Sequence, residues 1–97
     1  MKTITVTGGK DNAQKFEAVL YSTHGPLAVT KLESDRFYVV THIATGGKCR
    51  GFRLLKSANA AAKSWQDFDW NIAGFDDRPK LAIIYAQMKQ TPEFNGD

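Results

Sequence analysis

The chain has 97 residues, of which 42% are hydrophobic and 24% are charged, and its formal net charge is +3. This length allows one hydrophobic core but not a core plus a second module, so we predict a single domain over residues 1–97. The composition is that of a soluble globular protein, which excludes the disordered and disulfide-rich classes.

Cysteine content and hydropathy bear on where the protein is located. Cys49 is the only cysteine, so no intrachain disulfide can form. The sequence shows neither a signal peptide nor an apolar run of about 18 residues. We therefore expect a soluble, cytoplasmic protein that does not associate with membranes.

Charge is distributed unevenly along the chain. Residues 1–63 contain ten Lys or Arg and four Asp or Glu, whereas residues 64–97 contain three and six. The first part is therefore basic and the second part acidic. Such asymmetry can provide a charged face for a partner, although a well-solvated surface gives the same pattern.

Five short strands are expected in the basic part of the chain, because apolar and polar side chains alternate there between glycine-rich or polar turns. We predict them over residues 1–7, 15–22, 27–32, 37–43 and 49–55. The connections between them are short. Short connections favour an antiparallel meander, since parallel neighbours need crossovers of about a dozen residues.

The segment RFYVVTHIATGGKCRGFRLLK, residues 36–56, is the clearest hairpin. Its first strand places two sets of side chains on opposite faces: Phe37, Val39 and Ile43 on one, and Tyr38, Val40 and His42 on the other. Gly46 and Gly47 permit the positive φ angles that a tight turn needs. The return strand then leads into a helix.

Two helices are expected after the strands. The first begins at the N-cap Ser57 and ends at Gly74, with one apolar side made of Ala58, Ala61, Ala62, Trp65, Phe68 and Ile72. The second is capped by Asp76 or Asp77, has Pro79 in its first turn, and has an apolar stripe of Leu81, Ile84, Tyr85 and Met88.

The order of these elements predicts the fold class. Strands followed by helices are typical of a segregated α+β domain. We therefore predict an antiparallel sheet of four to five strands, followed by two helices packed on one face. Residues 93–97 are expected to form a frayed polar tail that Phe94 could anchor.

Few residues suit catalysis or metal binding. His24 and His42 are the only imidazoles, and thiol catalysis would need one of them beside Cys49. A contact between His42 and Cys49 is geometrically feasible across the hairpin, but the sequence offers no third group to orient it. Two histidines and one cysteine without close spacing do not match a metal-ligand set. We expect a non-enzymatic protein without a metal or other cofactor.

One candidate binding surface is the basic hairpin, with Lys48, Arg50, Arg53 and Lys56 close to several aromatic residues. Lysine and arginine bind phosphates, and aromatic rings stack on unpaired bases, so this composition suits a nucleic-acid surface. Arg50 and Arg53 are nevertheless expected on opposite faces of the strand, which would divide the basic patch.

The other candidate is the acidic segment WQDFDWNIAGFDDR, which contains Asp67, Asp69, Asp76 and Asp77. Helix capping explains one of the last two carboxylates. Trp70 falls outside the apolar side of the predicted helix, so it is either an exposed protein-binding residue beside the carboxylates or a core residue. A tryptophan flanked by carboxylates suits a basic surface on a protein partner.

A further indication comes from VVTHIATGG followed by GFRLLKSANAAAKSW, within residues 27–65. This pattern of hairpin, second strand and alanine-rich helix resembles small proteins of phages and other mobile elements, and the size is similar to that of phage-encoded anti-CRISPR proteins. The resemblance implies a non-enzymatic interaction protein that inhibits a host defence complex in the host cytoplasm. The sequence itself is compatible with either a monomer or a dimer. Some such proteins place carboxylates where DNA phosphates would lie, a role that Asp67, Asp69, Asp76 and Asp77 could serve here, with Trp70 beside them as an aromatic partner-binding residue. The alternative is a small nucleic-acid-binding protein that uses the basic hairpin.

Overall fold

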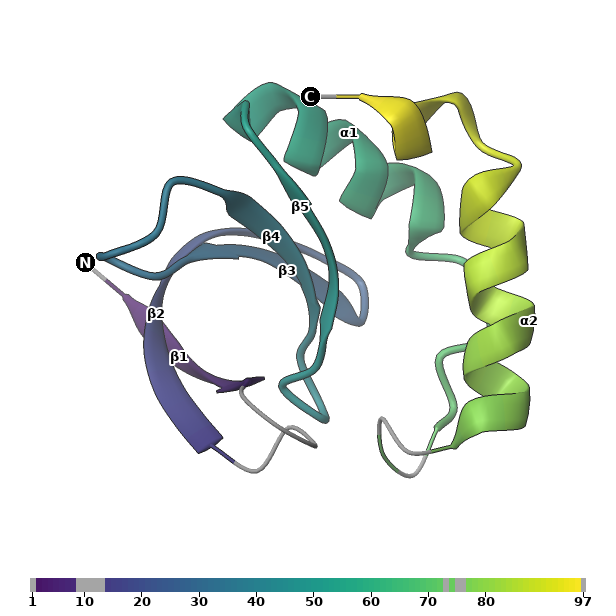
Figure 1. The fold of residues 1–97 in the computed structure, drawn as a ribbon, viewed down its shortest axis with the longest axis horizontal. Coiled ribbons are helices and arrows are strands. Elements are labelled where there is room, and N and C mark those ends of the chain that lie inside the picture. Colours follow the sequence, from purple (N-terminus) through teal and green to yellow (C-terminus); the bar gives the residue numbers. More distant parts are fainter. Residues whose placement is uncertain (1, 9–13, 73, 75–76, 97) are drawn as a thin grey trace.

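The protein is described by a computed structural model, which covers residues 2–8, 14–72, 74 and 77–96. In these ranges, five strands precede two α-helices and a short 3₁₀ helix (Figure 1). The strands are β1 (Thr3–Gly8), β2 (Gln14–His24), β3 (Leu27–Lys31), β4 (Tyr38–His42) and β5 (Lys48–Phe52). The helices are α1 (Leu55–Trp65), α2 (Arg78–Lys89) and the 3₁₀ helix η2 (Pro92–Asn95). The predicted α+β class is confirmed.

The sheet is an antiparallel meander in which each strand pairs with the next, in the order β1-β2-β3-β4-β5. The pairing of β2 with β3 shifts register between Leu20 and Ser22, and the pairing of β4 with β5 shifts near the end of β4. Irregularities of this kind increase local twist, and Figure 1 shows a strongly curled sheet. The backbone N–H of Thr7 donates to the carbonyl oxygen of Gly46 at 2.8 Å. The curl therefore brings β1 to the β4–β5 turn.

The core lies between one face of this sheet and the helices. The alternation predicted for residues 37–43 is confirmed, because Val40 is buried in the core whereas Phe37 and Ile43 are exposed on the surface. The buried core cluster consists of Leu27, Val29, Val40, Phe52, Ala58, Ala61, Ala62, Trp65, Trp70, Ile72, Ile84 and Met88. Small alanines on α1 let that helix lie close to β2 through β5.

Helix α1 is shorter than predicted and starts earlier. It begins at Leu55 after an extended Leu54, so Ser57 is inside the helix and is not its N-cap. It ends at Trp65, whereas the spacing of apolar residues predicted a helix up to Ile72. The indole N–H of Trp70 donates to the carbonyl oxygen of Trp65 at 2.8 Å. This bond satisfies a carbonyl at the helix end and turns the chain back onto the core.

Helix α2 begins close to the predicted position, with Pro79 in its first turn and Asp77 at the N-cap position. Asp77 makes no side-chain capping bond, and Asp76 lies outside the described residues. Ile84 and Met88 are buried, but Tyr85 is exposed. No helix within the described ranges is long and apolar enough to cross a membrane.

The prediction of a frayed tail from residue 93 is wrong for residues 93–95, which belong to η2. The ring of Phe94 lies 6.4 Å from that of Trp65 and 5.7 Å from that of Tyr85, measured between centroids. Phe94 therefore acts as the anchor that the sequence suggested, and it holds the 3₁₀ helix against α1 and α2.

Candidate functional site

The segment that follows α1, residues 66–71, is held to the core by Trp70. This side chain is 7% exposed, and its ring stacks on the imidazole of His42 with centroids 5.3 Å apart and planes 22° apart. Its indole N–H is bonded to the end of α1. The prediction that Trp70 could be an exposed binding residue is therefore wrong, and its alternative position in the core is correct. The reason is that β4 offers a flat aromatic partner that local sequence spacing does not reveal.

Asp67 and Asp69 project from this anchored segment. Both are exposed, whereas Phe68 between them is half-buried and packs against the core cluster. The Oδ1 atom of Asp69 accepts a hydrogen bond from the backbone N–H of Asn71 at 3.1 Å. Neither carboxylate forms an ion pair with a lysine or arginine of the described residues. The two acidic groups are thus displayed without an internal counter-ion, on a backbone that the core holds in place.

The beginning of α2 lies against the same segment. The Nζ atom of Lys80 donates to the carbonyl oxygen of Asn71 at 2.6 Å. Asp77 is half-buried three residues before Lys80. Of the predicted acidic residues, Asp67 and Asp69 are therefore exposed on this segment, Asp77 is half-buried before α2, and Lys80 is a positive charge bonded to the same segment.

The four basic residues of the predicted nucleic-acid surface do not share one face. Lys48 is exposed and lines the pocket described below. The guanidinium of Arg50 lies over the rings of Phe52 and Phe94, 5.1 and 4.6 Å from their centroids, on the side of the sheet that carries the helices. The remaining pair, Arg53 and Lys56, is exposed around the start of α1.

Arg50 serves packing more than it serves an outer surface. Its Nε atom is buried and has no hydrogen-bond partner, whereas its guanidinium lies over two aromatic rings. Cation–π contacts of this kind stabilise an arginine in a partly apolar environment. The sequence predicted that Arg50 and Arg53 would lie on opposite faces of the strand, but β5 ends at Phe52 and Arg53 lies beyond it. Lys48 and Arg50, which strand alternation would place on one face, flank the register shift between β4 and β5.

His42 and Cys49 have protonation properties that do not suit thiol catalysis. Burial raises the pKa of the Cys49 thiol to about 12, although a backbone hydrogen bond from His42 opposes this shift. Burial also lowers the pKa of His42, opposed by a hydrogen bond to the backbone of Trp70. The Nδ1 atom of His42 lies 2.8 Å from the hydroxyl oxygen of Thr45. A thiol that stays protonated at neutral pH is a weak nucleophile, and the imidazole is occupied by structural contacts.

His24 is likewise engaged in packing, since its Nε2 atom lies 3.3 Å from Oδ1 of Asn59 on α1. Asn59 also accepts a hydrogen bond from the hydroxyl of Ser22. The contacts of Asn59 with Ser22 and His24 thus hold α1 against β2.

Within the described part of the chain, no group of three or more His, Cys, Asp or Glu side chains is placed to hold a metal ion.

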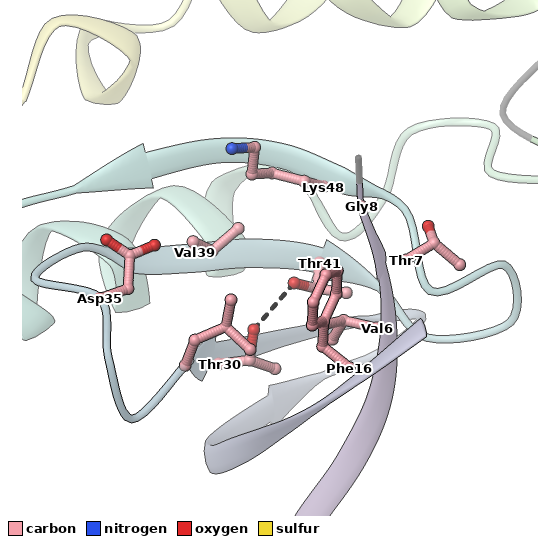
Figure 2. A pocket seen from close by; sticks show the side chains of 10 residues that line it. Val6, Thr7, Gly8, Phe16, Thr30, Asp35, Val39, Thr41 and Lys48 are labelled. Atoms are coloured by element: carbon pink, nitrogen blue, oxygen red, sulfur yellow. Dashed lines mark hydrogen bonds between the residues drawn. The ribbon is translucent and has the colours of Figure 1, made fainter. Parts of the chain in front are cut away.

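A pocket of about 100 Å³, which was not predicted from the sequence, lies on the sheet face turned away from α1 (Figure 2). Its lining residues come from all five strands and the β3–β4 connection: Val6, Thr7, Gly8, Phe16, Thr30, Leu32, Asp35, Val39, Thr41 and Lys48. Strand alternation could place Val39 on this face. Only the curl of the sheet, however, brings β1 and β5 to the same space.

Comparisons with protein families, with curated proteins and with solved structures found no match to this chain. The candidate functional features are exposed carboxylates on an anchored segment, dispersed basic residues, and a small pocket on the opposite sheet face.

Proposed function

We propose that this protein is a non-enzymatic inhibitor that presents Asp67 and Asp69 to the basic, nucleic-acid-binding groove of a host defence complex. The observation that supports the proposal is the anchored acidic segment. Trp70 is packed on His42 beneath it, and the two carboxylates point away from the core without counter-ions. The resemblance to anti-CRISPR proteins suggests the class of target.

The anchoring of the acidic segment favours binding, because a flexible segment would lose conformational entropy when it becomes ordered on a partner. A segment already fixed by a buried tryptophan and a hydrogen bond to α1 has less freedom to lose on association. Free carboxylates also have no internal ion pair to break before they meet lysines or arginines of a partner. Charge complementarity of this kind raises association rates and favours basic partners over acidic ones.

The competing function, direct nucleic-acid binding, has less structural support. Its four basic residues are separated, and Arg50 is committed to contacts with Phe52 and Phe94. A phosphate-binding surface needs several cations along one backbone path. Lys48 and the pair Arg53 and Lys56 are the exposed members left for that role.

The test is a target-DNA binding assay with purified CRISPR effector complexes and a fluorescent DNA duplex. We expect the protein to prevent DNA binding by a susceptible complex, with an inhibition that weakens as salt is raised, because exposed charges are screened. The protein alone should leave the DNA anisotropy unchanged. The proposal would be overturned in favour of nucleic-acid binding by two results together. Every effector complex tested would bind DNA normally in the presence of the protein, and the protein itself would bind the bare duplex in a salt-sensitive way.

A further inference from the structure

The pocket on the curled sheet combines an apolar wall with polar groups at its base and mouth. Val6, Phe16, Leu32 and Val39 supply apolar wall surface. Figure 2 shows the Thr30 and Thr41 hydroxyls bonded to each other between these walls, with Asp35 and Lys48 at one side of the space. A concave apolar site with a few convergent polar groups is the usual form of a small-molecule site.

The hydroxyl pair at the base has unused hydrogen-bonding capacity. The Oγ1 atoms of Thr30 and Thr41 lie 3.0 Å apart, and these side chains are 2% and 1% exposed. Two hydroxyl groups carry two hydrogens, and the bond between them uses one. The second hydrogen has no acceptor among the described residues. A buried donor in this state calls for an oxygen from outside the chain.

Two opposite charges lie at the mouth without neutralising each other. Lys48 and Asp35 both line the pocket, and the described residues contain no ion pair between them. The Oδ1 atom of Asp35 accepts the backbone N–H of Arg36 at 2.7 Å, which fixes the carboxylate. A ligand that carries an anionic and a cationic group side by side would satisfy both side chains.

We propose that this pocket binds a short hydroxy amino acid, of which threonine has the matching shape. Its hydroxyl would bond with the Thr30–Thr41 pair and its methyl would contact the wall formed by Val6 and Val39. Its carboxylate would face Lys48, and its ammonium group would face Asp35. An apolar protein cavity of about 150 Å³ accommodates benzene, so a pocket of about 100 Å³ suits the three heavy atoms of this side chain.

This inference does not depend on the proposed inhibitory function, because strands β1 to β5 and the β3–β4 connection build the pocket without the acidic segment. The test is an NMR titration with L-threonine that follows the methyl signals of Val6 and Val39. L-valine is the matched probe, since it has the same shape without the hydroxyl. We expect saturable shifts with threonine and at least about tenfold weaker binding of valine, because valine leaves the buried hydroxyl donor unpaired.

The variant Thr30→Val/Thr41→Val should reduce threonine affinity by at least about tenfold and remove the preference over valine. If it does not fold, Lys48→Met provides the second arm, because Lys48 is exposed. That change should weaken threonine binding, while Lys56→Met, at an exposed lysine outside the pocket lining, should not. Equal binding of threonine and valine to the unmodified protein, or no saturable shift with either, would overturn the proposal. The proposal would also be overturned if N-acetyl-threonine methylamide, which lacks both charges, bound as tightly as L-threonine.

Discussion

Trp70 connects the candidate binding surface to the core at the level of a single residue. It stacks on His42 and bonds to the carbonyl oxygen of Trp65, so it supports both the sheet and the end of α1. Asp67 and Asp69 depend on it for their position, since the segment that carries them runs between Trp65 and Trp70.

The first prediction concerns this side chain. Trp70→Ala should lower the free energy of unfolding by about 3–5 kcal/mol, as is usual when a buried aromatic residue is truncated. Trp70→Phe keeps an aromatic ring but removes the indole donor to the Trp65 carbonyl, which still accepts the backbone N–H of Phe68 at 3.2 Å, so it should cost less, about 0.5–1.5 kcal/mol. Urea denaturation followed by circular dichroism measures both. A loss below about 1 kcal/mol for the alanine variant would show that the anchor is not energetically important.

The second prediction concerns the pH dependence caused by His42. Burial lowers its pKa from the ordinary value of 6.5, so the native imidazole stays neutral at a pH where the unfolded chain already binds a proton. Unfolding is therefore favoured as the pH falls below about 6.5, and stability decreases until the native pKa is reached.

Denaturation of the protein and of His42→Asn between about pH 8 and pH 5 tests this effect, because their difference isolates the imidazole from the carboxylates. The variant should be less stable at neutral pH but should lose less stability on acidification. Parallel curves for the two proteins would contradict the lowered pKa.

At the scale of elements, the β4–β5 turn closes the curl of the sheet. Gly46 has a φ angle of +74°, a backbone conformation that residues other than glycine rarely adopt. A Cβ atom added there would lie 3.3 Å from the carbonyl oxygen of Thr5 and from the backbone nitrogen of Thr7. The turn therefore requires glycine both for its backbone conformation and for its close approach to β1.

The third prediction follows from this turn. Gly46→Ala should destabilise the protein by about 1–3 kcal/mol, since the strained backbone and the crowding against β1 add together. Gly51→Ala is the matched control, because its Cβ would meet Phe37 at an ordinary 3.4 Å and no positive φ is involved. Thermal unfolding of the two variants gives the comparison. A Gly51 variant as unstable as the Gly46 variant would refute the special role of the turn.

The strands could be predicted from sequence because each has its own period of two and its own turn, which are local signals. The end of α1 could not, because Trp65 and Phe68 fit a helical stripe as well as they fit the observed turn. The choice between them is made by the contact of Trp70 with His42, which lie 28 positions apart in the sequence. The tail was mispredicted for the same reason, since Phe94 contacts residues of β5, α1 and α2 that are distant in sequence.

The candidate sites differ in how far sequence revealed them. Asp67 and Asp69 could be proposed from the sequence because acidic residues cluster among aromatic ones, but the burial of Trp70 needed the structure. The pocket could not be predicted. At the base of the pocket, the Thr30 hydroxyl is bonded to the Thr41 hydroxyl, and at its mouth β5 lies beside the β3–β4 connection. The pocket therefore depends on the register of the strands and on the curl of the sheet.

At the scale of the whole molecule, the net charge of +3 hides two differently charged regions. The acidic residues Asp67 and Asp69 are exposed at the end of α1, and the basic residues Arg53 and Lys56 are exposed around its start. The helix is 11 residues long, so at about 1.5 Å per residue these groups lie more than a Debye length apart at physiological salt. A partner can therefore discriminate between the two ends of α1.

The most direct test of the acidic-surface mechanism compares two charge reversals in the complex-binding assay. Asp67→Lys/Asp69→Lys should fold normally, since exposed substitutions usually change stability by no more than about 0.5 kcal/mol, and should abolish binding to the inhibited complex by placing like charges together. Arg53→Glu/Lys56→Glu, the matched control at the other end of α1, should bind with nearly unchanged affinity. Unchanged affinity of the aspartate variant together with lost affinity of the control would contradict the account and move the binding site to the basic residues.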